Sequence, residues 1–191
     1  MSWKIQKRPD DMVDSELRQA QLRLAIHDVY ACNVNAWADR SLDPTVTGSD
    51  VTAQFKVDNN TDVQIVEVID PAPVRHLVKY FIGTGLRLLK KGVDSSRTDI
   101  GKEDILGEIS ATFVVSYVST HAEAPTQSML MAFSDNVVHH MWPYWREFLQ
   151  SATARFRLPA VVLPMRLVQQ SPQPSSNPNL TEKPAVTERH Q

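Results

Sequence analysis

Cysteine is nearly absent from this 191-residue chain, which contains only Cys32. A single cysteine cannot form a disulfide within the chain, and proteins without a disulfide framework are typical of a reducing compartment. We expect Cys32 itself to be a small strand residue that is buried or half-buried.

Long apolar runs are missing as well. Charged residues interrupt the apolar stretches within roughly ten residues, whereas a helix needs about 20 to cross a bilayer. The first nine residues are basic and have no apolar stretch behind them, unlike a secretory signal. The sequence therefore predicts a cytoplasmic protein without a membrane span.

A strongly basic character is also lacking, since the net charge is −2 and the pI is near 6.3. Binding to phosphate backbones needs a positive field, so we expect no nucleic acid partner. Hydrophobic residues make up 42% of the chain, which is ordinary for a globular domain with a sizeable core.

Motifs of enzymes and metal sites are not found either. The Gly83-Thr84-Gly85 run lacks the lysine and the third glycine of a phosphate-binding loop, and no serine or cysteine nucleophile motif is present. His139 and His140 point in different directions on a helix, and Asp135 adds one ligand at most. We expect a protein that is not an enzyme and has neither a metal nor a cofactor.

What the sequence does contain is a series of strand patterns. Apolar residues alternate with polar ones, or gather with β-branched and aromatic residues, in five segments: 21–37, 51–57, 63–69, 74–89 and 105–119. Within the fourth segment, Gly83 and Gly85 suggest a bulge or the close approach of another backbone.

Helical patterns lie at the two ends. Asp14 or Ser15 can begin a short helix that continues to Ala20. From Ser128 onward the apolar spacing becomes helical, and we expect Pro143 to begin the main helix because proline suits a first turn. Strands followed by a helix predict an α+β fold with an antiparallel sheet.

Domain limits follow from composition. We predict a flexible N-terminus over 1–13, one domain over 14–168 and a disordered tail over 169–191, where proline, serine and polar residues replace any apolar pattern.

The segment 133–147, followed by Arg155 and by 158–164, resembles the signature of the SecB-like export chaperones. The positions that carry the resemblance are Pro143, Tyr144, Arg146, Glu147, Pro159, Leu163 and Pro164. The stretch 106–109, with Phe113 behind it, looks like the third strand of that family.

The resemblance implies a four-stranded antiparallel sheet packed with a long C-terminal helix. It also implies a homo-oligomer, a dimer or a dimer of dimers, joined through sheet edges and helices. The implied activity is ATP-independent binding of unfolded polypeptides, either preproteins for the Sec translocase ATPase or an antitoxin. The last eleven residues, 181–191, carry balanced charges instead of the acidic tail with which classical members contact that ATPase.

Large apolar residues are candidates for a client-binding groove, because methionine and aromatic side chains adapt to varied partners. The candidates are Trp37, Leu42, Val115, Tyr117, Phe133, Met141 and Trp142. The same residues could equally form the core or a subunit interface. Two other functions remain open: a small-molecule or lipid carrier with an apolar pocket between sheet and helix, and an adaptor for one folded partner.

Overall fold

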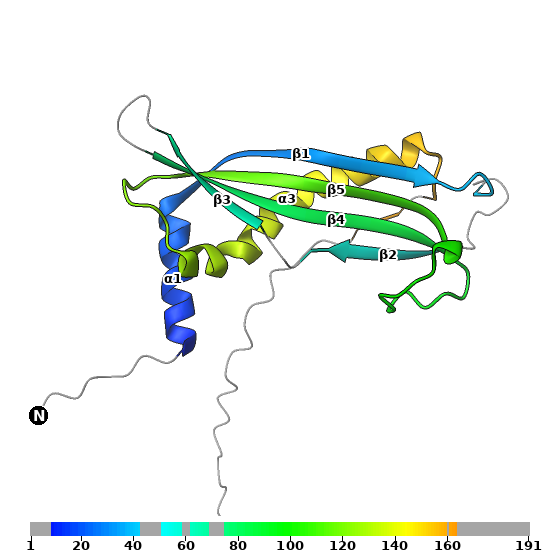
Figure 1. Ribbon diagram of the computed structural model, residues 1–191, viewed down its shortest axis with the longest axis horizontal. Coiled ribbons are helices and arrows are strands. Elements are labelled where there is room, and N and C mark those ends of the chain that lie inside the picture. Colours follow the sequence, from blue (N-terminus) through cyan, green and yellow to red (C-terminus); the bar gives the residue numbers. More distant parts are fainter. Residues whose placement is uncertain (1–8, 43–50, 59–61, 69–74, 160, 164–191) are drawn as a thin grey trace, which may run out of the picture.

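The structure is a computed structural model that describes residues 9–42, 51–58, 62–68, 75–159 and 161–163. Figure 1 shows a long twisted sheet with one helix lying along a face and another at one end. The elements in chain order are α1 (Pro9–Arg23), β1 (Leu24–Ala38), β2 (Val51–Val57), β3 (Asp62–Val68), β4 (Arg75–Lys90), η1 (Lys102–Asp104), β5 (Ile105–Ser119) and α3 (Gln127–Arg155).

The sheet is antiparallel throughout, with the order β1-β5-β4-β2 and with β3 also paired to β4. β2 pairs with the second half of β4, from Thr84 to Lys90, and β3 pairs with its first half, from Arg75 to Phe81. The two short strands therefore lie end to end along one edge. The predicted α+β fold is confirmed, although five strands fill the four positions across the sheet.

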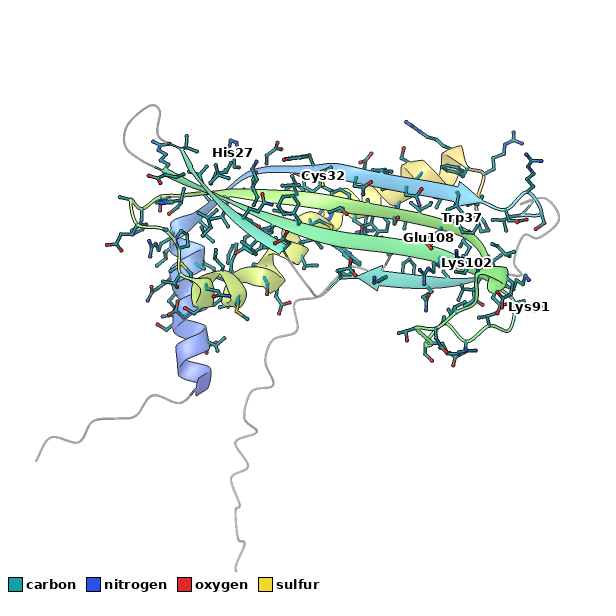
Figure 2. All side chains as sticks on the ribbon, viewed as in Figure 1. His27, Cys32, Trp37, Lys91, Lys102 and Glu108 are labelled. Carbon is teal, nitrogen blue, oxygen red and sulfur yellow. The ribbon has the colours of Figure 1, made fainter. Side chains whose placement is uncertain are left out.

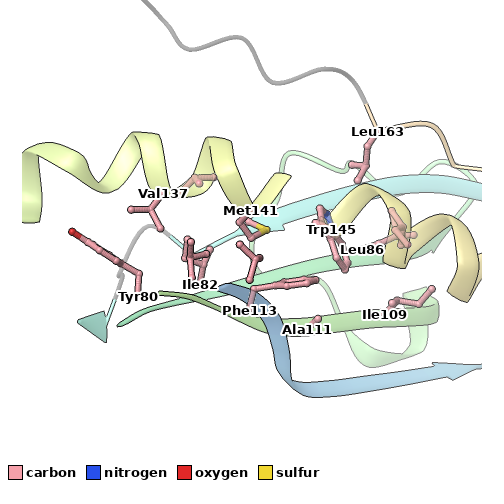
Figure 3. Packing of buried hydrophobic residues seen from close by; sticks show 14 of the residues in the cluster. Tyr80, Ile82, Leu86, Ile109, Ala111, Phe113, Val137, Met141, Trp145 and Leu163 are labelled. Carbon is pink, nitrogen blue, oxygen red and sulfur yellow. The ribbon is translucent and has the colours of Figure 1, made fainter. Parts of the chain in front are cut away.

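Alternation along β4 and β5 directs one set of side chains toward α3. Ile82 and Leu86 of β4, and Ile109 and Phe113 of β5, are all at most 3% exposed. In Figure 3 these side chains meet Met141 and Trp145, which point down from α3. The core is this single layer between the sheet and the helix, because a strand presents every second residue to the same face.

The main helix begins earlier than the sequence predicts. α3 starts after Thr126, whose hydroxyl accepts a hydrogen bond from the Met129 backbone N–H at 3.3 Å, and it continues through Pro143. The prediction that Pro143 begins the helix is therefore wrong. Proline removes one backbone hydrogen bond from a helix interior, and the sequence rule does not register the apolar contacts along both halves of α3 that hold the helix together.

The C-terminal end of α3 has a Schellman motif. The N–H of Leu158 donates to the Thr153 carbonyl at 2.9 Å, and the N–H of Arg157 donates to the Ala154 carbonyl at 3.2 Å. Arg157 adopts a φ of 53°, a left-handed conformation that glycine occupies more easily. Leu158 and Leu163 then turn back into the core.

Two further predictions near the N-terminus need correction. α1 begins at Pro9 and ends at Arg23, so the short helix expected from Asp14 or Ser15 to Ala20 is longer at both ends. Cys32 is exposed rather than buried, because β1 shifts register between Ala31 and Asn33 at the sheet's edge. The predicted flexibility of 1–8 and the predicted disordered tail concern residues outside those described.

Candidate functional site

The sheet has two unlike faces, which the strand register defines. α3 covers the face that carries the core, and in Figure 1 it crosses behind the strands. The opposite face, called the open face below, has no helix over it among the described residues. The open face is therefore one surface that a partner can reach.

One end of the open face is apolar. Tyr30 of β1 lies opposite Val114 of β5, which lies opposite Phe81 of β4. Two rows further along the same face, beyond Lys79 and Ser116, Val118 pairs with Leu77. Tyr30 is 42% exposed whereas Val114 is 1% exposed, so the row presents a wide apolar ledge with a filled centre. Such a ledge can accept apolar side chains of a partner.

The middle of the open face is polar and hollow. Asn33 pairs with Thr112, and Asn35 pairs with Ser110, across β1 and β5. Thr112 and Ser110 are in turn opposite Gly83 and Gly85 of β4. These small and polar residues line a cavity of about 600 Å³, called the polar trough below.

The loop between β4 and β5 forms one wall of the polar trough. The side-chain amide of Gln54 on β2 donates to the carbonyls of Ser95 and Arg97, at 2.8 Å each. Within the loop, the Asp94 carboxylate accepts from the backbone N–H and the hydroxyl of Ser96, and these bonds lower the pKa of Asp94. The loop is therefore a fixed wall.

Each charged group that lines the trough has a partner of opposite sign, and Arg97 lies 3.2 Å from Asp99 within the loop. Arg87 donates through Nε to Glu108 at 2.9 Å on the adjacent strand, and Lys56 lies 2.8 Å from Asp58. Both pairs are partly or largely exposed, so each contributes little to stability. Because the charged groups are paired with one another, the amide and hydroxyl groups are the ones that can hydrogen-bond to a ligand.

The outer edge of β1 is the second feature that a partner could use. β1 pairs only with β5 among the described strands, and it is 15 residues long. Large apolar side chains are exposed along it: Ile26, Tyr30, Val34 and Trp37. Figure 2 shows Trp37 near the end of the strand, beside Glu108 of β5, and Cys32 farther back along it. A long edge with exposed apolar groups is a place where another chain pairs.

Most of the predicted groove residues lie in the core. Val115, Tyr117, Phe133 and Met141 are at most 2% exposed, between sheet and helix. Leu42 is also buried, and Trp142 is partly buried against the same cluster. As folded here, these side chains are covered by their own chain. Trp37, at 40% exposure, is the most exposed of the seven candidates.

Tyr117 and His140 form a polar contact inside this core. The Tyr117 hydroxyl and His140 Nδ1 are 2.7 Å apart, and the Phe133 ring packs edge-on against Tyr117. Burial lowers the pKa of His140, and the charge of His139 lowers it further. Burial raises the pKa of Tyr117, so its hydroxyl stays protonated. These groups join α3 to the central strand and need no ligand.

The motif residues have mixed locations. Tyr144 is 47% exposed, so its ring does not pack on the sheet. Pro143 and Glu147 are exposed, Arg146 and Pro159 are half-buried, and Leu163 belongs to the core. Pro164 lies outside the described residues. Most of the motif residues therefore lie on the exposed side of α3 or in the segment that follows the helix.

The described residues hold no cluster of three or more histidine, cysteine, aspartate or glutamate side chains arranged for a metal ion. In the described part, no helix combines the length and the apolar character needed to cross a membrane.

Comparison with known proteins decides the fold. No family model matches the sequence, and no curated protein matches it. A solved structure of the Mycobacterium tuberculosis SecB-like chaperone Rv1957, in complex with a ChAD peptide from the HigA1 antitoxin, superimposes with a TM-score of 0.54 at 18% identity. The match covers 82% of this chain and 99% of that one. This chain has a SecB-like fold.

The fold that the 133–164 motif implied is therefore confirmed. Sequence reasoning missed the open face of this SecB-like sheet, because alternation shows two faces without showing which one the helix covers. The only signal of the polar trough was the pair Gly83 and Gly85. The register runs unbroken past both, so neither forms a bulge.

Proposed function

We propose that this chain is a molecular chaperone that binds non-native polypeptides without ATP. The observation that carries the proposal is the row of exposed apolar side chains along β1, on a strand whose outer edge is unpaired among the described residues. The likeness in fold to a SecB-like chaperone that was solved with a peptide supports it. Tyr30 and Trp37 point to the open face, where an extended client segment can use them while the edge of β1 stays available to a second copy.

The same edge supports self-association. Monomeric proteins protect long edge strands, and β1 has none of the proline or lysine residues that usually do so. We propose that copies of the chain join through β1 into a dimer or a dimer of dimers, which leaves the open face for clients. Preproteins and an antitoxin remain the two proposed client classes, and the antitoxin peptide bound to the structural relative favours the second.

The carrier alternative needs an apolar cavity between sheet and helix. That space is filled by side chains such as Phe113, Met141 and Trp145, and Phe113 and Trp145 stack edge-on at 6.3 Å between ring centroids. The polar trough opens on the other face. No observation favours a lipid site.

The test is suppression of aggregation. An unrelated enzyme is heated until it unfolds, and light scattering is followed with increasing amounts of this chain and no nucleotide. We expect scattering to fall to background near equimolar subunits and ATP to have no effect. Trp37→Lys, on the open-face side of β1, should reduce suppression, whereas Val162→Lys, which is more exposed but lies outside the sheet, should not. Unchanged scattering at a tenfold excess of the wild-type chain would refute the proposal.

A further inference from the structure

The polar trough contains two amide side chains that the fold itself does not use. Asn33 and Asn35 are exposed on β1 and line the cavity, and neither makes a side-chain hydrogen bond within the described part of the chain. A carboxamide offers two N–H donors and one carbonyl acceptor. Each of these residues therefore presents both kinds of group toward the open face.

The spacing of the two amides fits the backbone of an extended polypeptide. Residues two apart on a strand lie about 6.7 Å from each other, because a strand rises by roughly 3.3 Å per residue. An extended polypeptide repeats its backbone N–H and C=O groups on one side at the same distance. A chain lying along β1 over the trough would thus offer equivalent backbone groups to Asn33 and to Asn35.

The absence of a side chain at Gly85 makes the trough deeper than the packing of the neighbouring residues requires. A Cβ added at Gly85 would meet its nearest neighbours, the Ile109 carbonyl and Lys56 Cβ, at 3.9 Å, which is ordinary contact. Gly85 is therefore not dictated by its neighbours, although glycine weakens a strand interior. Gly83 differs, because its Cβ would collide with the Asp58 carboxylate. The bare position at Gly85 leaves room for another backbone to approach.

The charge of the trough also fits a peptide main chain, which is neutral. Arg87 pairs with Glu108, Lys56 with Asp58, and Arg97 with Asp99 of the loop, so the lining has no strong preference for an anion or a cation. The free groups are the amides of Asn33 and Asn35 and the hydroxyls of Ser110 and Thr112. Neutral groups that both donate and accept suit a peptide main chain.

We propose that the polar trough binds the main chain of a non-native polypeptide in extended form. The amides of Asn33 and Asn35 hydrogen-bond to the N–H and C=O groups of alternate client residues, and Gly85 lets the client lie close to the sheet. The apolar ledge at Tyr30 and Phe81 receives client side chains beside it. This inference rests on the proposed chaperone function and specifies how one site recognises clients without reading their sequence.

The first experiment removes both amides. The probe is a fluorescent twelve-residue peptide of alanine, serine and threonine with one tryptophan, and its Kd is measured by anisotropy. We expect Asn33→Ala/Asn35→Ala to raise the Kd about tenfold, since each lost hydrogen bond costs roughly a factor of five or less. Gln64→Ala is the matched control, because Gln64 is an exposed amide on β3 outside the trough, and it should change the Kd less than twofold.

The second experiment distinguishes backbone from side-chain recognition. A version of the probe with alternate backbone nitrogens methylated has the same side chains and fewer N–H donors. The wild-type chain should bind it about tenfold more weakly, and the double variant should bind both probes alike. If methylation of the probe weakened its binding to the double variant as much as its binding to the wild type, the proposal would be overturned.

Gly85→Ala provides a variant that we expect to fold, because the added methyl group makes only ordinary contacts. It should melt at or above the wild-type temperature and still bind the probe several-fold more weakly, because a methyl group raises the floor. If a permanently unfolded, alkylated protein does not bind the wild-type chain at all, the chaperone function itself fails. If that protein binds and the amide and Gly85 variants bind it like wild type, only the trough is wrong.

Discussion

Tyr117 on the central strand β5 and His140 on α3 are joined by a 2.7 Å contact between the hydroxyl and Nδ1. The Tyr80 hydroxyl on β4 makes a second polar link, donating to the Leu130 carbonyl of α3 at 3.2 Å. The two bonds favour one position of α3 along the strands, within a layer that apolar side chains otherwise fill.

Removing the Tyr117 hydroxyl should measurably loosen its link to His140. Tyr117→Phe is expected to lower the free energy of unfolding by about 1 to 2 kcal/mol, since it leaves His140 Nδ1 without its partner. Urea unfolding at neutral pH measures the change. Tyr30→Phe is the control, because Tyr30 is 42% exposed on the open face, and it should cost under about 0.5 kcal/mol. Equal effects of the two substitutions would contradict the role given to Tyr117.

The stability of the fold should also depend on pH through His140. Burial lowers the pKa of His140 below its ordinary value of 6.5, so the unfolded chain binds the proton more readily than the folded chain. Stability is then fully present above that value and decreases as the pH falls through it. Thermal melts at pH 7.5 and 5.5 should show this decrease in the wild type, and His140→Gln should flatten it. An identical slope in the variant would contradict the assignment.

Two neighbouring aromatic residues on α3 should differ sharply. Trp145 is 1% exposed and packs on Phe113, so Trp145→Ala is expected to cost about 3 to 5 kcal/mol. Tyr144 is 47% exposed, and Tyr144→Ala should cost less than about 1 kcal/mol. Denaturant unfolding of both variants tests the placement of α3 on the sheet. A large effect at Tyr144 would mean that its ring is covered, for example by another subunit.

The end of α3 offers a stabilising change. Arg157 adopts a left-handed conformation at the position where a Schellman motif usually has glycine. Arg157→Gly should raise the free energy of unfolding by about 1 kcal/mol, because it removes the steric cost of a Cβ there. Arg155→Gly, inside the last helical turn, should instead lower stability by about 1 kcal/mol. A loss of stability in both variants would argue against the motif.

Cys32 reports on the edge of β1. It is exposed near the middle of a 15-residue strand, and it is the chain's only cysteine. If two copies pair antiparallel about the middle of β1, a mild thiol oxidant should join the two thiols into a disulfide, with loss of two hydrogens to the oxidant. Non-reducing electrophoresis should then show a species of twice the 21.5 kDa chain mass, and reductant should abolish it. Persistence of the monomer band at micromolar concentration would count against pairing at this position.

The strands were predictable because their apolar periodicity is local. The segments 51–57 and 105–119 match β2 and β5, since alternating burial imprints a period of two on the sequence. The start of α3 was not predictable in the same way. The Trp142-Pro143 pair indicates a helix boundary locally, whereas burial of Met141 and Trp145 on either side keeps the helix continuous.

The candidate site was harder to predict than the fold. Val115, Phe133 and Met141 are the kind of residues that line client grooves, but the same chemistry fills cores, and only the position of α3 separates the two roles. Asn33 and Asn35 could not be predicted as site residues, because asparagines on a strand have no signature until the register places them in one row with Thr112 and Gly83 and in the next with Ser110 and Gly85. No local sequence pattern shows which distant strands pair or in which register.

The most direct test of the whole account compares one polypeptide in two states. A small model protein is prepared folded and, by reduction and alkylation, permanently unfolded, and the binding of each form to this chain is measured by calorimetry without nucleotide. We predict micromolar or tighter binding of the unfolded form and no detectable binding of the folded form. Equal affinity for the two forms, or no binding of either form, would contradict the claim that this SecB-like sheet holds non-native chains.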